Sequence, residues 1–582
     1  MIMRKIRGGI RYARETLRWL SFRRFCRVLR NSGVRLTRLD YLPEGYLALL
    51  GEASGPADSD TLRFGPSSWG KDAVSGHCFP RIPSPFIRLE YGRGFDPKSP
   101  WAASSFQWAV RQSASAPEDR VEFERWAVLA SGWIARNPAG IGIDWISPME
   151  CSRRVVNLSL AASSWWPLLQ SDDSLNAILA RSIVEHAEFI SRNPEVKPGG
   201  LTTNHTTANY CGLLACALSV PGFHRSSPWV HQAAEGLESC IARQVGREGM
   251  SFEGSIPYSF LVLDIFAHGA LLMRRAGIPP SSEYLGLLRG LFDFILDVAD
   301  SKGNLPQVGD DDSGEWVTPR SSGMVPMLAC LYEAIYGVRP GPVPAFRIRG
   351  ESGIVSIRRG GFEALVAACP VGQEGLGGHN HEDLLQLCLA YRGIPVVVDP
   401  GTGSYNRDLE QRSLFRSMHV HNGPVPDGAT HYYEFPVGAP FDLLSAKPVS
   451  TSLEASDAPG RTGAVIRATV DGRTLARIVR LDGDSIEVRD SVESRSAGTC
   501  GFDVKLTIDP RWTLRPSGAG RLTLVSSGAE LEFQAGVPVH IVKGLYSPRY
   551  DVIVEADMII MHAEPGGGLL FRIVERGPTR TG

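Results

Sequence analysis

The sequence lacks a net charge, a pattern of paired cysteines and a long apolar run, and each absence narrows the possible functions. Its 582 residues include 61 Lys and Arg against 62 Asp and Glu, which leaves a formal net charge of −1. This balance argues against a dedicated nucleic-acid-binding protein, because contacts to phosphates require a basic surface. We therefore expect no nucleic acid among its partners.

The ten cysteines are scattered along the chain and form no Cys-x-x-Cys pair. Several lie within apolar segments, among them Cys211, Cys216 and Cys388. This placement is typical of small buried side chains and not of a disulfide framework or a thiolate zinc site. It fits a reducing compartment.

No apolar stretch in the sequence reaches the ~20 residues that a membrane span requires. Charges run through the first thirty residues, so no signal peptide is visible, and by sequence alone we expect a cytoplasmic protein. Residues 1–40 form a basic N-terminal arm with twelve Lys and Arg and two acidic residues. Its interleaved apolar and basic residues predict either peripheral contact with an anionic membrane surface or an arm whose apolar stripe packs on its own domain.

Helical periodicity dominates the sequence between residues 41 and 340. Apolar residues recur at three- and four-residue spacing, and short polar links, often with Pro or Gly, separate the segments. Long helices with short links pack as antiparallel hairpins, so this region predicts a large helical bundle or a closed ring of hairpins. The clearest predicted helices are 121–136, 149–166, 174–192, 203–219, 227–244, 257–276, 281–300 and 323–336.

A Pro- and Gly-rich segment at 337–346 ends the helical pattern, and short alternating runs follow it. Many strands without a long helix predict an antiparallel β-sandwich over residues 345–582. The predicted fold is thus an α domain followed by a β domain. The clearest predicted strands are 353–359, 362–368, 384–391, 394–400, 464–470, 476–481, 485–492, 522–527, 530–534 and 551–562.

Histidines and carboxylates gather in the first part of the predicted sandwich. If strand 384–391 extended backwards, His379, His381 and Asp383 would share one face, because side chains alternate along a strand. Asp399 ends the next strand, and His421 could return to the same place. Two imidazoles and a carboxylate suit Zn²⁺. The alternative is a polar turn whose histidines are satisfied by hydrogen bonds.

Two helix starts carry further candidates. Asn204 and His205 follow capping threonines, and Tyr258 comes directly after Pro257, a residue that suits the first helical turn. Helix N-termini attract anions, so the same field would ease ionisation of the Tyr258 phenol. Ordinary capping and an ordinary buried tyrosine are the alternative interpretation.

An acidic run offers a third candidate. Paired carboxylates suit glycoside hydrolysis, but a Gly-Asp-Asp-Asp-Ser-Gly sequence is equally good turn chemistry. The acidic residues concerned are Asp310, Asp311, Asp312, Glu315, Glu150 and Glu253.

Six segments together resemble one family, the heparinase II/III-like polysaccharide lyases. They occur in the family's order and cover most of residues 130–430. This resemblance implies an N-terminal (α/α) toroid over residues 41–340 and a C-terminal antiparallel β-sandwich over 345–582. The matching segments are 137–158, 204–210, 248–259, 307–316, 378–405 and 415–428.

The resemblance implies cleavage of an anionic, uronic-acid-containing polysaccharide by β-elimination, in a cleft between the domains. Asn204 and His205 match the pair that faces the uronate carboxylate. Tyr258 matches the catalytic tyrosine, as an acid or as both acid and base. His379 matches the histidine that assists proton transfer, and Tyr405 is a further candidate at the same cleft.

A structural Zn²⁺ is also implied, because His381, Asp399 and His421 match the family's zinc ligands. His419 adds an imidazole shortly before the expected ligand, so the third ligand is open between His419 and His421.

The chain also departs from the family pattern. Ser259 follows the tyrosine where His is common, and Asp311 stands where Asn is usual. Most relatives are exported, so the resemblance implies the periplasm or cell envelope, whereas the sequence shows no export signal.

Three alternatives to a lyase remain open on the sequence. The acidic residues could serve a glycoside hydrolase, and the same scaffold could bind a glycan without cleaving it. A cupin-type metal enzyme also uses His-x-His on a strand. However, cupins place their Glu several residues after the pair, whereas Glu382 follows it immediately.

Overall fold

The computed structural model describes residues 2–29, 32–53, 68–321, 323–436, 438–456, 460–494 and 500–576, with side chains from residue 13 onward. The chain forms two compact units that are not continuous in sequence. The first unit comprises Met1–Gln244, Leu261–Arg289 and Glu315–Pro340, and the second comprises Val245–Phe260, Gly290–Gly314 and Gly341–Gly582.

Helices make up the first unit, and all eight helices predicted from periodicity are confirmed, with ends within about two residues. Helix α12 begins in the second unit and α13 ends there. The helices are α1 (Ile2–Leu29), α2 (Glu44–Glu52), α4 (Lys98–Ala103), α5 (Gln107–Ser115), α6 (Arg120–Arg136), α7 (Pro148–Ser164), α8 (Trp166–Leu169), α9 (Asp173–Arg192), α10 (Asn204–Ser219), α11 (Ser226–Gln244), α12 (Ile256–Arg275), α13 (Ser282–Val298) and α14 (Met324–Tyr336).

Helix α9 illustrates why these segments are helical. The carboxylate of Asp172 caps its start by accepting a hydrogen bond from the backbone N–H of Leu175. Leu179, Ile183 and Ile190 follow at helical spacing and are buried. One apolar face therefore packs into the unit, which is the usual source of helix stability in a folded protein.

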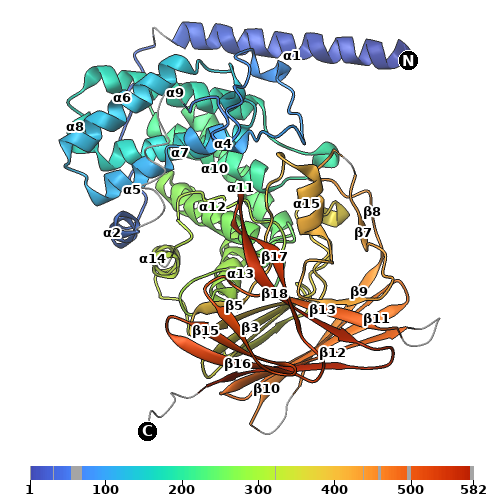
Figure 1. Cartoon of the computed structure of the whole chain (residues 1–582). Helices are drawn as coiled ribbons and strands as arrows, with labels where there is room; N and C mark the ends of the chain where they lie inside the picture. Colours follow the sequence, from blue (N-terminus) through green and yellow to red (C-terminus); the bar gives the residue numbers. More distant parts are fainter. Residues whose placement is uncertain are drawn as a thin grey trace. The chain divides into compact units, whose positions relative to one another are not determined.

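The basic arm forms helix α1, and the C-terminal half of this helix packs on the first unit (Figure 1). Phe22, Cys26 and Leu29 are buried at helical spacing, and the Phe22 ring makes an edge contact with Phe189 at 5.7 Å. Leu17 remains exposed. The packed stripe supports the second interpretation of the arm, while membrane contact stays a prediction. Residues 30 and 31 lie outside the described part.

Helix α12 has the length and apolar composition of a membrane span, contrary to the expectation that no segment does. Its apolar window is completely buried inside the protein, as expected for a core helix. Length and composition alone therefore do not separate a core helix from a spanning one.

The second unit is built on antiparallel sheets, which confirms the predicted class of the C-terminal region (Figure 1). A five-stranded meander contains β1 (Phe346–Arg349), β2 (Ile354–Arg359), β3 (Phe362–Ala367), β4 (Gln386–Tyr391) and β5 (Ile394–Val397). An eight-stranded sheet has the order β14 (Thr513–Gly518), β15 (Arg521–Ser526), β16 (Ala529–Ala535), β19 (Leu569–Glu575), β12 (Ser485–Ser494), β11 (Arg473–Leu481), β10 (Thr462–Val470) and β9 (Val449–Ala455).

Two smaller sheets and one short helix also belong to the unit. The four-stranded sheet has the order β17 (His540–Arg549), β18 (Val552–Ala563), β13 (Phe502–Thr507) and β6 (Pro424–Pro426). Strands β7 (Tyr433–Glu434) and β8 (Ser445–Ala446) form a two-stranded sheet, and α15 spans Leu409–Arg416.

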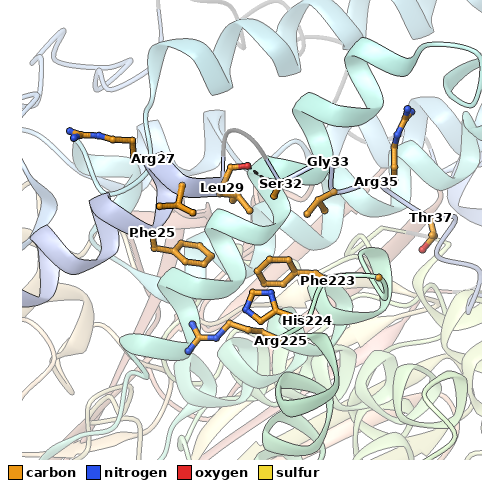
Figure 2. Close-up of a pocket in the computed structure, with 13 residues that line it drawn as sticks. Phe25, Arg27, Leu29, Ser32, Gly33, Arg35, Thr37, Phe223, His224 and Arg225 are labelled. Carbon is orange, nitrogen blue, oxygen red and sulfur yellow. Dashed lines mark hydrogen bonds between the residues drawn. The ribbon is translucent and has the colours of Figure 1, made fainter.

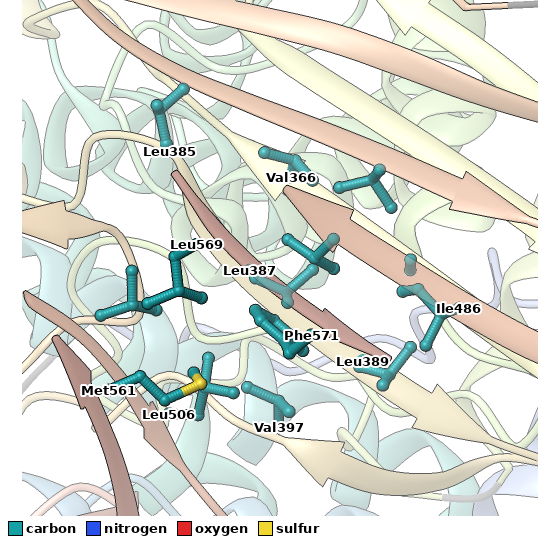
Figure 3. Packing of buried hydrophobic residues seen from close by; sticks show 14 of the residues in the cluster. Val366, Leu385, Leu387, Leu389, Val397, Ile486, Leu506, Met561, Leu569 and Phe571 are labelled. Carbon is teal, nitrogen blue, oxygen red and sulfur yellow. The ribbon is translucent and has the colours of Figure 1, made fainter. Parts of the chain in front are cut away.

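Apolar side chains from several sheets share one core (Figure 3). Leu387 and Leu389 of β4 belong to it together with Ile486 of β12 and Phe571 of β19. Full burial of one such side chain contributes about 1.5–3 kcal/mol. This core fixes the start of β4, directly after the segment that carries the candidate histidines.

The backward extension of β4 is wrong. The strand begins at Gln386, and residues 378–385 form turns and irregular backbone. Leu385 has a φ of 59°, a left-handed conformation that is incompatible with a continuous strand. The candidate histidines therefore lie on a loop before the strand and not on one strand face.

Segments 245–260 and 290–314 belong to the second unit, although helical periodicity alone groups them with the helices. The backbone N–H of Ile256 donates to the carbonyl of Val308 at 3.0 Å. Arg349 of β1 pairs with the buried carboxylate of Asp297 at 3.1 Å. Glu253, Tyr258 and the three aspartates 310–312 therefore belong to the same unit as the histidines.

Candidate active site and metal centre

Tyr258 lies in the first turn of α12, and Ser255 holds that turn. The Ser255 hydroxyl accepts a hydrogen bond from the Tyr258 backbone N–H at 3.2 Å and donates to the carbonyl of Asp310 at 2.6 Å. One side chain thus both caps the start of α12 and ties it to the acidic run.

Three predicted site residues meet in the second unit. The hydroxyls of Tyr258 and Tyr405 are 3.1 Å apart, within hydrogen-bond distance. The Tyr258 ring stacks on the His379 imidazole, with centroids 3.8 Å apart and planes at 23°. All three side chains are buried. Residues separated by up to 147 positions in the sequence therefore form one cluster.

The surroundings of Tyr258 oppose the ionisation that a helix N-terminus would ease. Burial raises the pKa of the phenol well above its ordinary value, and the nearby carboxylates of Asp312 and Asp310 raise it further. The hydrogen bond from Tyr405 acts in the opposite direction but does not offset these effects. Tyr258 is therefore a protonated phenol, a state that can give a proton to a leaving group.

Two buried carboxylates flank His379. Its Nδ1 lies 3.0 Å from Oδ2 of Asp310, and its Nε2 lies 3.6 Å from Oε2 of Glu253. Both acids appeared in the sequence only as members of an acidic group with alternative roles. Nothing in the local sequence distinguishes Asp310 from the two residues after it.

Asp310 is paired with Arg412 of α15, a residue that the sequence analysis did not single out. Both side chains are buried, and Arg412 donates to the two carboxylate oxygens. Burial by itself raises the pKa of Asp310. The guanidinium and the neighbouring histidines outweigh burial and hold that pKa well below its ordinary value.

Glycine at position 309 lets the acidic run lie close to the loop that carries His379. Its φ is +72°, and an added Cβ would lie 2.8 Å from the carbonyl oxygen of Gly254 and 2.9 Å from that of His379. The next residue, Asp310, donates its backbone N–H to the same His379 carbonyl at 2.9 Å. A side chain here would push the acidic run away from the histidine loop.

The predicted metal ligands also come together. His381, Asp399 and His421 are all buried, and one ligand atom from each lies within 4.8 Å of the others. Nδ1 of His381 and Nε2 of His421 are buried without a hydrogen-bond partner among the described residues. Orphaned imidazole nitrogens beside a carboxylate fit a zinc ion, whose ligands are of these types. His419 lies outside this group and contacts His431.

The environment keeps His381 neutral. Burial lowers its pKa to about 4, although Asp310 acts in the opposite direction. Burial also disfavours the charged form of His421, but Asp399 outweighs it and raises the His421 pKa. A neutral imidazole with a free lone pair is the state that ligates a metal.

Asn204 and His205 begin α10 in the first unit, as predicted. Thr203 and Thr206 form a capping box at this helix start. Asn204 is buried, whereas 47% of the His205 side chain is exposed. Polar side chains thus gather at this helix N-terminus, a place that favours anions.

Glu195 is a site residue that the sequence analysis missed. Its Oε1 lies 3.0 Å from Nδ1 of His205, and its Oε2 accepts hydrogen bonds from the Met149 backbone N–H at 2.7 Å and from Nδ2 of Asn209 at 3.0 Å. Burial alone raises the pKa of Glu195, but His205, Asn209 and Met149 outweigh it and lower that pKa. An ionised Glu195 therefore orients His205.

The other acids of the run make contacts of two kinds. Asp311 accepts from the backbone N–H of Ser313 at 2.7 Å, and Asp312 accepts from that of Gly314 at 2.8 Å. Glu315 pairs with Arg111 at 3.2 Å. The turn interpretation therefore describes Asp311 and Asp312, whereas Asp310 contacts His379 and His381.

A separate cavity of about 1260 Å³ lies beside the end of α1 in the first unit (Figure 2). Phe25 and Phe223 contribute apolar lining, and Arg27, Arg35 and Arg225 lie around it. None of the candidate site residues lines this cavity. Its charge is partly compensated, because Arg35 pairs with Asp173 and Arg225 with Glu188.

Two family models match the chain in the order of its two regions. The model of the heparinase II/III N-terminus matches residues 107–318, and the heparinase II/III-like C-terminal model matches residues 342–579. The chain belongs to the heparinase II/III-like family.

A heparin-sulfate lyase from Pedobacter heparinus is 22% identical over 350 residues, which cover 55% of this chain and 51% of that protein. The match thus spans about half the length of this curated relative. The family assignment rests on both regions, whereas the identity with this relative is low.

Solved structures show the same fold. A crystal structure of heparinase III has a TM-score of 0.65 at 14% identity and covers 97% of this chain and 90% of its own. The heparan sulfate lyase HepC from Pedobacter heparinus has a TM-score of 0.54 at 16% identity, with coverage of 85% and 81%. These matches confirm a helical toroid followed by an antiparallel β-sandwich as the fold class.

Proposed function

We propose that this chain is a polysaccharide lyase that cleaves a uronic-acid-containing polysaccharide by β-elimination. Membership of the heparinase II/III-like family supports this reaction class, and relatives named as heparin-sulfate and heparan sulfate lyases support an anionic glycosaminoglycan as substrate. The observation that carries the proposal is the buried cluster of Tyr258, Tyr405 and His379.

The first requirement of the reaction is neutralisation of the uronate carboxylate. The C5–H group of the uronate is a poor acid, because loss of its proton places a second negative charge beside the carboxylate. Asn204 and His205 would bind the carboxylate at the start of α10, and Glu195 would hold His205 in position.

The second requirement is a base and an acid. A base removes the C5 proton, the electron pair forms the C4–C5 double bond, and the bond from C4 to the glycosidic oxygen breaks. Tyr258, kept protonated by its surroundings, would give its proton to the departing oxygen. His379 would assist by taking the C5 proton, and Tyr405 would hydrogen-bond to the Tyr258 hydroxyl.

We further propose that His381, Asp399 and His421 hold a structural Zn²⁺. The ion would supply positive charge that fastens the loops of the second unit to one another. His379, two residues from a ligand, would be held in place by the same loop. The proton transfers proposed above involve only side chains of the protein.

The test is incubation of the pure protein with a panel of uronate polymers, followed by ultraviolet absorbance of the unsaturated uronate. We expect absorbance to rise with at least one polymer, to be abolished in Tyr258→Phe and to be strongly reduced in His205→Ala. Tyr284→Phe is the matched control, since it removes a buried hydroxyl that donates to the Phe266 carbonyl in the first unit.

Two other outcomes would favour the alternatives. New reducing ends without the chromophore would indicate a glycoside hydrolase that uses carboxylates such as Glu253. Binding across the panel with no turnover would indicate a non-catalytic glycan-binding protein. Either result would contradict elimination by Tyr258.

A further inference from the structure

One carboxylate contacts both the candidate catalytic histidine and a candidate metal ligand. Oδ2 of Asp310 lies 3.0 Å from Nδ1 of His379, and its Oδ1 lies 2.9 Å from Nε2 of His381. The Asp310 side chain is completely buried, so water does not compete for these hydrogen bonds.

Arg412 determines which way these hydrogen bonds run. Its guanidinium donates to both oxygens of Asp310, one of them at 2.7 Å, and it has no acceptor. A carboxylate held by a bidentate arginine is an acceptor only. The two histidine nitrogens that face Asp310 must therefore carry the protons.

The two histidines face Asp310 with different ring nitrogens. In the neutral imidazole, donation from Nδ1 of His379 leaves the lone pair on Nε2, and donation from Nε2 of His381 leaves it on Nδ1. Nδ1 of His381 is indeed buried with no hydrogen-bond partner among the described residues. Nε2 of His379 lies 3.6 Å from Glu253, which is beyond an ordinary hydrogen bond.

We propose that Asp310 is a positioning residue that fixes His379 and His381 in opposite tautomers. One histidine then offers a basic Nε2 for proton transfer and the other a basic Nδ1 for the metal. This inference rests on the proposed function for the role of His379. It makes the metal centre and the catalytic histidine depend on one side chain.

The central variant is Asp310→Asn, which keeps the shape of the side chain. An amide has one accepting oxygen and one donating nitrogen, so it can satisfy only one histidine in its original tautomer. We expect zinc affinity, kcat or both to fall at least tenfold, in line with the usual effect of removing a hydrogen-bond partner of a metal ligand. KM should change much less than kcat.

Stability must be separated from positioning, because Asp310→Asn leaves Arg412 as an unpaired buried charge. The double variant Asp310→Asn/Arg412→Gln removes both charges and should recover much of the thermal midpoint without recovering kcat or zinc affinity. Asp490→Asn is the matched control. It breaks a buried ion pair with Arg477 at 2.7 Å in the same unit and contacts neither histidine.

Three measurements test whether Asp310 positions the two histidines. Competition with a chelator measures zinc affinity, long-range proton–nitrogen spectra of histidine-labelled protein report each tautomer, and the pH profile of kcat reports the base. The proposal is overturned if Asp310→Asn keeps both tautomers, or if the double variant recovers kcat together with its thermal midpoint. The first two readouts need no substrate, so they stand even if no polymer is cleaved.

Discussion

The phenol ring of Tyr258 lies almost flat against the imidazole of His379, with ring centroids 3.8 Å apart. The two rings are in van der Waals contact, so a sugar must approach their polar edges and not enter between their faces. Both residues belong to the second unit, although periodicity assigns Tyr258 to the helical region. The proposed acid and its partner are therefore positioned by one compact unit.

This contact predicts a large effect at His379. We expect His379→Ala to lower kcat by about 10²–10⁴-fold, the usual contribution of a general acid or base. His379→Gln should retain part of the packing on Tyr258 but not the proton transfer. Initial rates of unsaturated uronate formation measure the effect. His562→Ala, which removes an exposed imidazole paired with Asp503, is the control. Equal rates in wild type and His379→Gln would exclude the proposed role.

A second prediction concerns Glu195, which contacts His205 in the first unit. Glu195→Gln removes the charge beside His205 but keeps the size of the side chain, so we expect kcat/KM to fall roughly tenfold with little loss of stability. Asp173→Asn is the control, because it breaks an exposed pair with Arg35. An unchanged kcat/KM would show that His205 needs no orienting carboxylate.

A third prediction concerns the proposed zinc ion. Metal analysis of the purified protein should find about one zinc per chain, and a strong chelator should lower the thermal midpoint together with activity. His421→Ala should reproduce the chelated state, whereas His419→Ala should not, since His419 lies outside the ligand group. Cobalt or cadmium should restore both properties if the metal is structural. Full activity after verified metal removal would contradict a structural ion.

The burial of His186 leads to a prediction about how the stability of the protein depends on pH. Burial, together with Arg154, lowers its pKa to about 3, and the imidazole is neutral in the folded protein. The unfolded chain binds this proton below a pH of about 6.5, so the free energy of unfolding should decrease as pH falls from about 6.5 toward 3. Each unit of pKa difference is worth about 1.4 kcal/mol.

Denaturant titrations at several pH values test this dependence. His186→Gln should show a flatter loss of stability toward low pH than the wild type, because no proton is taken up at this site on unfolding. The exposed His224 provides the control variant His224→Gln, which should follow the wild-type curve. Parallel curves for wild type and His186→Gln would contradict the prediction.

Periodicity predicted the secondary structure well where a segment has one buried face. Helix α9 and strand β10 show the spacing that their burial requires, and both are found as predicted. The backward extension of β4 failed because a single left-handed residue, Leu385, ends the strand. The local sequence also does not show the burial and the nearby carboxylates that raise the pKa of Tyr258.

The sequence by itself determined the order of the helical and β regions and the family, since those depend on local periodicity and on motifs that can be read along the chain. Only the tertiary structure decided which acid of the run reaches the histidines, and that Glu195 faces His205. Asp310 meets His379 across 69 positions and Arg412 across 102. Such contacts depend on how distant loops pack and on which charges are removed from water, and neither leaves a local pattern.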